Sequence, residues 1–184
     1  PPDRSAAVAL RKSRQNWVDA GMDLLRQEGQ QSLTIERLTQ ELGVTKGSFY
    51  HHFGNLANYR QALLNWWEEA FTHEPIRIAW QENDARLRSQ RLSRAVRDLD
   101  HPLELAIRAW GLRDPEVAQT VANVDLQRLE CLTGLHQDQG HPQAELVAYL
   151  EYTAFVGGQL IKPAPEGATR ALQQALELWR KHGS

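Results

Sequence analysis

The sequence predicts an all-α protein, because apolar residues recur at helical spacing and helix start and stop signals separate the runs. The stretch 34–53 is the clearest example. Its apolar positions fall into two helical sets, which are Ile35, Leu38 and Leu42, then Phe49 and Phe53. Gly43 separates the two sets, so this stretch is predicted to form a helix-turn-helix.

Both helices begin with the same signal, a threonine that can act as N-cap and an apolar residue just before it. Thr34 follows Leu33, and Thr45 follows Val44. Gly43 stands where the first helix would end in a left-handed residue. Two such starts would fix the angle at which each helix leaves the turn.

The outer face of the second helix suits close contact with DNA. Once the apolar positions are assigned inward, this face carries small, hydrogen-bonding, cationic or aromatic residues and no carboxylate: Thr45, Lys46, Gly47, Ser48, Tyr50, His51 and His52. A recognition helix presents its N-terminal residues to base edges, and a glycine there lets the backbone approach DNA. The alternative is an ordinary helical corner of an all-α protein.

A family resemblance is carried by residues 33–53. With the flanking residues from about Arg14 to Leu64, this stretch closely resembles the DNA-binding signature of the TetR (tetracycline-repressor-like) family of bacterial transcriptional regulators. The resemblance implies an all-helical homodimer with an N-terminal three-helix helix-turn-helix DNA-binding domain, residues 1–54. It also implies a C-terminal helical domain, residues 55–184, that dimerises and binds a small effector, with a linking helix at about 56–73.

The resemblance also implies roles for individual residues. Five would approach the major groove, namely Thr45, Lys46, Gly47, Ser48 and Tyr50. Phosphates would be held by Thr34, Tyr50, His51 and Tyr59. The family commonly opens its fourth helix with a lysine and a glutamate where Leu56 and Ala57 stand here. The usual lysine contact to phosphate would therefore pass to Tyr59, Arg60 or Asn58.

Composition is that of a folded protein without a membrane span. At 184 residues and 41% hydrophobic content, the chain can bury a core. The longest apolar stretch, 147–161, is interrupted by Glu151 and is shorter than the roughly 20 residues that cross a bilayer. The start has no apolar signal-peptide core, and the single Cys131 cannot form an internal disulfide. We therefore expect a cytoplasmic protein.

Net charge is nearly balanced along the chain. Residues 1–53 carry +1 and the remainder −3, so DNA binding would depend on where the charges lie and not on their sum. Four cations cluster near the N-terminus, which are Arg4, Arg11, Lys12 and Arg14. They could follow phosphates or a minor groove, or form a solvated face.

Helix signals continue on both sides of the helix-turn-helix. The first helix is expected from near Ser5 to Gln27, with Trp17 in the core. The fourth is expected from Leu56, capped by Asn55, to about His73, where Pro75 would end it.

Further helices are expected in the second half of the chain. Residues 83–98 alternate leucines and valine with arginines, which favours an amphipathic surface helix over a second basic nucleic-acid face. A helix follows from Pro102 through Trp110, and the next starts at Asp114-Pro115 and reaches about Gln139. Within it, Asp125 and Arg128 are expected to form a surface ion pair, with pairing across a cavity or partner as the alternative.

Two C-terminal helices, 142–161 and about 168–179, are predicted to form an isologous four-helix interface with a second subunit. Its candidate residues are Val147, Ala154, Gly158, Leu172, Ala175 and Trp179. An intramolecular hairpin against the domain core is the alternative.

The effector is expected to be an apolar or aromatic small molecule. Its pocket would be bordered by Trp80, Trp110, Tyr149, Tyr152 and Phe155. No catalytic motif, cofactor or metal site is expected, because the sequence has no phosphate-binding glycine loop or serine elbow. The polar residues 136–145 straddle a turn that does not direct them to one metal ion.

These observations predict a sequence-specific DNA-binding transcriptional regulator. It would act as a repressor that binds double-stranded, pseudo-palindromic operator DNA and is released by the effector. The alternative is a helical dimerising regulator that acts through protein contacts, with weak DNA binding or none.

Overall fold

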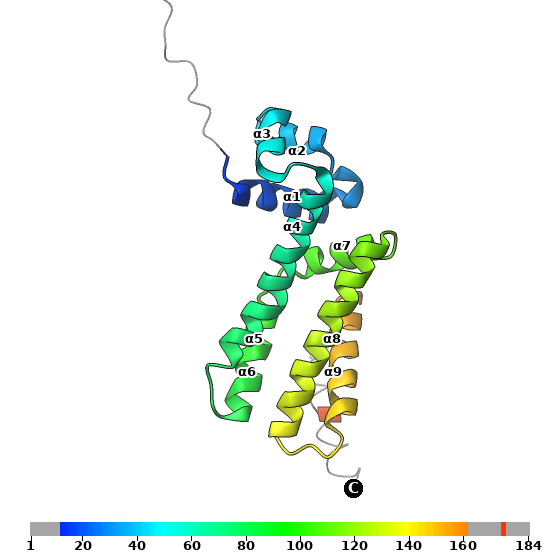
Figure 1. The fold of residues 1–184 in the computed structure, drawn as a ribbon. Helices are drawn as coiled ribbons and strands as arrows, with labels where there is room; N and C mark the ends of the chain where they lie inside the picture. The colour runs from blue at the N-terminus through cyan, green and yellow to red at the C-terminus, as the bar shows by residue number, and fades with distance from the viewer. Residues whose placement is uncertain (1–11, 162–173, 176–184) are drawn as a thin grey trace, which may run out of the picture. The chain divides into compact units, whose positions relative to one another are not determined.

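The computed structural model describes residues 12–161 and 174–175, and these are helical with short connections and no strand among them (Figure 1). The chain divides into two compact units between Trp66 and Trp67, inside a single helix. We call residues up to Trp66 the head unit and those from Trp67 on the C-terminal unit. The all-α fold predicted from the sequence is confirmed.

From residue 12 on, where its description begins, the head unit contains a short 3₁₀ turn at Gln30–Ser32 and four helices. These are α1 (Arg14–Glu28), α2 (Ile35–Leu42), α3 (Lys46–Phe53) and α4 (Leu56–Glu68), of which α4 continues into the C-terminal unit.

Helix α1 begins later than the sequence predicted. Lys12 and Ser13 are not helical, because the Ser13 hydroxyl accepts from the backbone N–H of Asn16 and the Asn16 side chain accepts from the backbone of Ser13. This capping box starts the helix at Arg14. Arg4 and Arg11, which were predicted either to follow DNA or to form a solvated face, lie outside the described residues.

The turn between α2 and α3 follows the predicted signals with one exception. Thr34 Oγ1 accepts from the backbone N–H of Arg37 at 3.2 Å, and Gly43 is left-handed at φ 65° and ψ 36°. Thr45 has the extended conformation of an N-cap, but its hydroxyl accepts no hydrogen bond from α3. The N–H of Ser48, which a threonine cap would satisfy, donates to the Thr45 carbonyl oxygen instead.

An aromatic core fixes α3 in the head unit. Trp17 and Phe49 are fully buried with ring centroids 5.4 Å apart, and Phe53 lies 4.9 Å from Tyr59. The Tyr59 hydroxyl donates to the carbonyl oxygen of Trp17 at 2.7 Å. Gly21 makes this approach possible, because a Cβ at that position would lie 2.0 Å from the Tyr59 oxygen.

The described residues of the C-terminal unit form the end of α4, a π-helical turn at Glu69–His73, and five further helices. These are α5 (Glu74–Ala79), α6 (Ala85–Arg97), α7 (His101–Gly111), α8 (Pro115–Asp138) and α9 (Ala144–Gly158). Three of them begin at an aspartate whose side chain accepts backbone N–H bonds, namely Asp84, Asp100 and Asp114. No helix in the described part of the chain is long and apolar enough to span a membrane.

The sequence suggested that Pro75 ends a helix, but the chain remains helical on both sides of this residue. The chain passes from α4 through the π-helical turn into α5, with Pro75 in the first turn of α5. Proline has no N–H to give to the carbonyl of Phe71 four residues earlier. Arg128 Nη2 donates to that carbonyl oxygen at 3.3 Å, so a side chain of α8 contacts the backbone at this turn.

Helices α8 and α9 pack side by side (Figure 1). Val147 and Ala148 of α9 are buried, as are Val124 and Leu135 of α8. From the sequence, Val147 was expected to lie in the subunit interface. It is instead buried in the core of its own chain, so it cannot line that interface. Leu126 of α8 is 60% exposed.

Candidate nucleic-acid interface

The outer face of α3 is open to solvent. Thr45, Lys46, Gly47 and His51 are exposed, and Tyr50 is 52% exposed. Ser48 is half-buried, while Phe49 and Phe53 are buried on the opposite face. Thr34 at the start of α2 is also exposed. These exposed groups can donate and accept hydrogen bonds at the end of a helix whose free backbone N–H groups attract anions.

Two residues of the helix-turn-helix region have other roles than the sequence suggested. Tyr59 was expected to hold a phosphate, but it is fully buried and its hydroxyl donates a hydrogen bond to the Trp17 carbonyl oxygen. Burial also raises the pKa of Tyr59 above its ordinary value. His52, expected on the outer face, is half-buried, and its Nε2 donates to the Lys12 carbonyl oxygen at 2.9 Å.

Carboxylates neutralise most of the described cations near α2 and α3. Arg37 pairs with Glu28 at 2.7 Å and with Glu41 at 2.8 Å, so its side chain ties α2 to the end of α1. Lys46 of α3 pairs with Glu36 of α2. The hydrogen bond that Lys46 donates to Glu36 raises the pKa of Lys46. Sequence reasoning missed Glu36, because no periodic pattern links residues ten positions apart on different helices.

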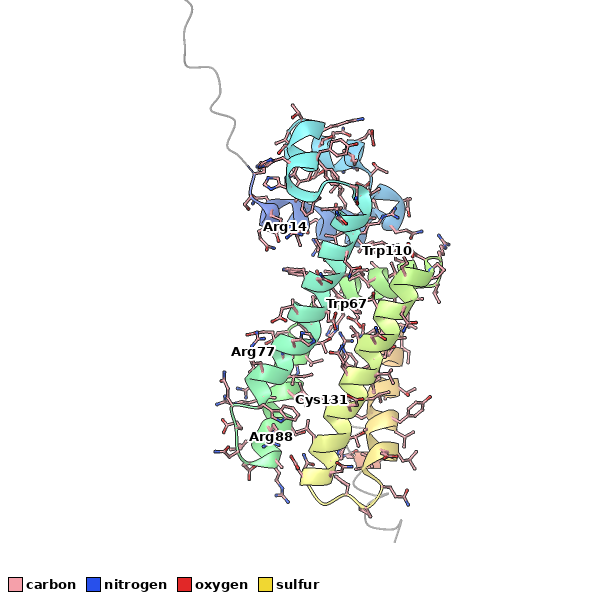
Figure 2. The ribbon with its side chains drawn as sticks, in the orientation of Figure 1. Arg14, Trp67, Arg77, Arg88, Trp110 and Cys131 are labelled. Carbon is pink, nitrogen blue, oxygen red and sulfur yellow. The ribbon has the colours of Figure 1, made fainter. Side chains whose placement is uncertain are left out.

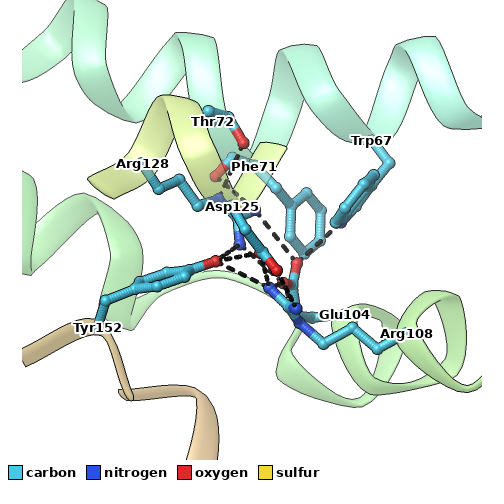
Figure 3. A network of polar contacts seen from close by, with 8 residues as sticks. All are labelled: Trp67, Phe71, Thr72, Glu104, Arg108, Asp125, Arg128 and Tyr152. Atoms are coloured by element: carbon cyan, nitrogen blue, oxygen red, sulfur yellow. Dashed lines mark hydrogen bonds and ion pairs between the residues drawn. The ribbon is translucent and has the colours of Figure 1, made fainter. Parts of the chain in front are cut away.

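A buried polar network occupies the C-terminal unit (Figure 3). Its centre is Glu104 of α7, which is 2% exposed. The Glu104 carboxylate accepts from Trp67 Nε1 at 2.8 Å, from Arg128 Nη1 at 2.7 Å and from Arg108 Nε at 3.0 Å. This single carboxylate thus joins side chains of α4, α7 and α8.

The second carboxylate of the network is Asp125. Arg108 donates to its two oxygens at 2.7 Å and 3.1 Å, and the Tyr152 hydroxyl donates to it at 2.6 Å. Arg128 Nε donates to the Thr72 hydroxyl at 3.0 Å. Asp125 and Arg128 were expected to pair with each other on the surface. They pair instead with Arg108 and Glu104 of α7, because both point inward from α8.

The five residues expected to border one effector pocket are dispersed. Trp110 and Tyr152 are buried, and the Tyr152 and Phe155 rings stack at 6.3 Å. Tyr149 is 60% exposed. The guanidinium of Arg88 lies over the Trp80 ring at 5.1 Å, and Figure 2 shows Arg88 and Trp110 at opposite ends of the C-terminal unit. Trp80 and Trp110 therefore do not line one pocket, since α5 and α7 present them at different ends.

The polar residues around the turn from α8 to α9 are engaged by protein partners. His136 Nε2 lies 2.7 Å from Glu151 Oε2, and Asp138 pairs with Arg88. No group of three or more His, Cys, Asp or Glu could hold a metal ion among residues 12–161 and 174–175. Burial raises the pKa of the Cys131 thiol to about 12, so at neutral pH it is protonated and a weak nucleophile.

His73, in the π-helical turn, sits between two acceptors. Its Nδ1 lies 3.0 Å from Glu69 Oε2 and its Nε2 lies 2.9 Å from Gln127 Oε1. The Gln127 amide donates through its nitrogen to Glu68 at 2.7 Å, which leaves its oxygen facing the imidazole. Both ring nitrogens must then donate, so the geometry selects the imidazolium, and these contacts raise the pKa of His73. Glu69 also pairs with Arg77 at 2.8 Å.

We expect His73 to make the stability of the C-terminal unit depend on pH. Because its pKa is raised in the folded state, its contribution is complete below about pH 6.5 and is lost as pH rises through the folded pKa. The site is partly exposed, so the loss should be a few tenths of a kcal/mol. Denaturant unfolding at pH 6 and pH 8 would measure it against His73→Gln. Identical pH dependence in the two proteins would contradict the assignment.

Comparisons with known proteins agree with this geometry. Residues 18–57 match the model of bacterial regulatory proteins of the tetR family. The chain is 33% identical over 70 residues to the transcriptional regulator AcuR of Cereibacter sphaeroides, which is 38% of this chain and 29% of that protein. It is 30% identical over 61 residues to TtgW, an uncharacterized HTH-type transcriptional regulator of Pseudomonas putida, covering 33% and 46%. The chain thus spans less than half the length of these curated relatives.

Solved structures share the whole fold. Escherichia coli NemR in its reduced form matches with a TM-score of 0.71 at 19% identity, over 89% of this chain and 96% of that one. A transcriptional regulator of Pseudomonas aeruginosa PAO1, itself of uncertain function, matches with a TM-score of 0.69 at 17% identity, over 92% and 90%. Residues 18–57 of the head unit carry the DNA-binding domain of the tetR family of bacterial regulatory proteins. The matched residues include α2 and α3, which form the helix-turn-helix of the head unit.

Proposed function

We propose that this protein is a cytoplasmic repressor that binds a pseudo-palindromic operator as a homodimer and leaves it when a small effector binds. The observation that carries the proposal is the exposed face of α3, which bears donors and acceptors, has no carboxylate, and is fixed from behind by Trp17, Phe49 and Phe53. Fixed recognition helices read base edges in the major groove.

Thr45, Lys46, Gly47, Ser48 and Tyr50 are the proposed groove residues, and Thr34, Tyr50 and His51 the proposed phosphate contacts. Their position along one exposed edge of the helix-turn-helix supports these roles. Tyr59 is not a proposed phosphate contact, because its hydroxyl is buried and donates a hydrogen bond within the protein.

Salt dependence tests the proposal. Affinity for DNA should fall steeply as salt rises, because phosphate contacts release counterions, and a preference for one sequence should remain at physiological salt. Binding that is weak and equal on all sequences would contradict a repressor. It would favour the alternative, a regulator that acts through protein contacts.

Replacing Lys46 by alanine should weaken operator binding by about 1–3 kcal/mol, because Lys46 is the only lysine or arginine within α3, 46–53. A competition assay with operator and scrambled duplexes would measure the loss. Arg86→Ala is a matched control, since it removes one exposed cation from the C-terminal unit and should leave binding nearly unchanged. Equal weakening on every sequence would make Lys46 a phosphate contact and not a base reader.

The proposed dimer face is the outer side of α9. Exposed apolar or small residues repeat there at helical spacing: Leu146, Tyr149, Leu150, Ala154 and Gly158. A second copy of the chain would bury this stripe. Ala175 is exposed as well, whereas Leu172 and Trp179 lie outside the described residues. Two heads should then meet half-sites about 34–36 Å apart, or a related spacing.

The proposed effector is an apolar or aromatic small molecule held in the C-terminal unit. The stacked rings of Tyr152 and Phe155 support this class. An effector should raise the melting temperature of the protein and lower its affinity for operator DNA. Compounds that bind without changing operator affinity would count against release by this class.

A further inference from the structure

Lys46, the first residue of α3, is held by a carboxylate from the neighbouring helix. Its ammonium pairs with Oε1 of Glu36, which lies in the first turn of α2. Both side chains remain largely open to solvent, at 56% exposed for Lys46 and 69% for Glu36. The pair therefore presents a donor and an acceptor together, at the N-terminal end of the recognition helix.

This pair combines two chemistries that match opposite partners of one base pair. An ammonium has three donors, so Lys46 can give one to Glu36 and still offer two to guanine O6 and N7. A glutamate carboxylate can accept from the N4 amino group of the cytosine paired with that guanine. Against a backbone phosphate, by contrast, the Glu36 carboxylate is repelled and competes for the lysine.

We propose that Glu36 is a specificity-determining residue, and that the Lys46–Glu36 pair reads one G·C base pair in each half-site. The inference rests on the proposed function, because it assumes that α3 enters the major groove. Glu36 acts in two ways. Its carboxylate accepts a hydrogen bond from cytosine. It also holds the Lys46 ammonium toward the base edges, so that this cation does not contact phosphates nonspecifically.

The test compares wild type, Glu36→Gln and Glu41→Gln on three duplexes. The first is the operator obtained by selection, the second is a series of operators in which each G·C pair is changed in turn to A·T, and the third is a scrambled sequence. Glu41→Gln is the matched control, because it removes the same charge from the same helix, where Glu41 faces Arg37 and not Lys46. Thermal melting of each variant checks that the head unit stays folded.

Wild type should lose about 5- to 150-fold in affinity when one particular G·C pair is changed, and Glu36→Gln should lose much less at that position. On the scrambled duplex, Glu36→Gln should bind about 2- to 5-fold more tightly, with a salt slope steeper by about 0.9, because Lys46 is released to a phosphate. Glu41→Gln should keep the discrimination of wild type. In a Lys46→Gln background, Glu36→Gln should no longer tighten nonspecific binding.

Two results would overturn the inference while leaving the repressor in place. One is a Glu36→Gln protein that tightens on operator and scrambled DNA by the same factor, since Glu36 would then be only a repelling charge. The other is Glu41→Gln matching Glu36→Gln on all duplexes. If wild type itself prefers no sequence, the proposed function fails, and the inference fails with it.

Discussion

Gly21→Ala should destabilise the head unit by about 2–4 kcal/mol. The new methyl group would fall 2.0 Å from the Tyr59 hydroxyl oxygen and 3.0 Å from Leu63 Cδ2, in the interface between α1 and α4. Relief requires that Tyr59 move, which breaks its buried hydrogen bond to Trp17 as well as the packing. Because the same core supports α3, operator affinity should fall too. Denaturant unfolding followed by circular dichroism would measure the change.

The control for this prediction is Gly134→Ala in α8. A Cβ at Gly134 would have no neighbour within 4 Å, so the substitution should stabilise the helix by about 0.5–1 kcal/mol. Adding Tyr59→Phe to Gly21→Ala removes the closest contact and should recover part of the loss. A Gly21→Ala protein as stable as wild type would mean that α1 and α4 do not approach as described.

Glu104→Gln should cost the C-terminal unit about 3–5 kcal/mol, because it leaves Arg108 and Arg128 in the interior without their shared carboxylate. Burial disfavours the charged carboxylate, but the hydrogen bonds and charges of Arg128 and Arg108 outweigh it and lower the pKa of Glu104. Its contribution is therefore present at neutral pH and is lost as pH falls through the lowered pKa. Unfolding by denaturant at pH 7 and at a pH well below 4.5, the ordinary value of a glutamate carboxyl, would measure both effects.

An exposed ion pair provides the contrast. Glu74→Gln removes one of the two carboxylates that pair with Arg77 on the surface, the other being Glu69, and should change stability little at either pH. If Glu104→Gln were equally mild, the network would contribute no more than a surface pair. The assignment of Glu104 as its centre would then be wrong.

Local signals were enough to predict the helix-turn-helix. Thr34 caps a backbone N–H only three residues away, and Gly43 ends the helix that directly precedes it. The cap and the left-handed turn could therefore be located from the sequence alone. The same holds for Asp114 and Pro115 at the start of α8. Periodicity likewise identified Phe49 and Phe53 as the buried side of α3.

Partners distant in the sequence could not be predicted in this way. The burial of Tyr59 depends on Gly21 and on the Trp17 carbonyl, 42 residues away. Arg128 reaches Glu104 of another helix, although Asp125 is nearer in sequence. The chain stays helical past Pro75 through a π-helical turn whose backbone a side chain of α8 contacts. Each of these contacts depends on how helices pack against one another. The spacing of residues along a single helix gives no information about that packing.

The most direct test of the central claim is a binding selection from random duplexes with the full chain at about physiological salt. We predict an enriched inverted repeat whose half-sites lie about 34–36 Å apart or at a related spacing, bound some 10³-fold or more tightly than bulk DNA. An inverted repeat would require two heads and would support the α9 dimer face. Enrichment of single half-sites would contradict the dimer, and no enrichment with a folded protein would contradict a sequence-specific repressor.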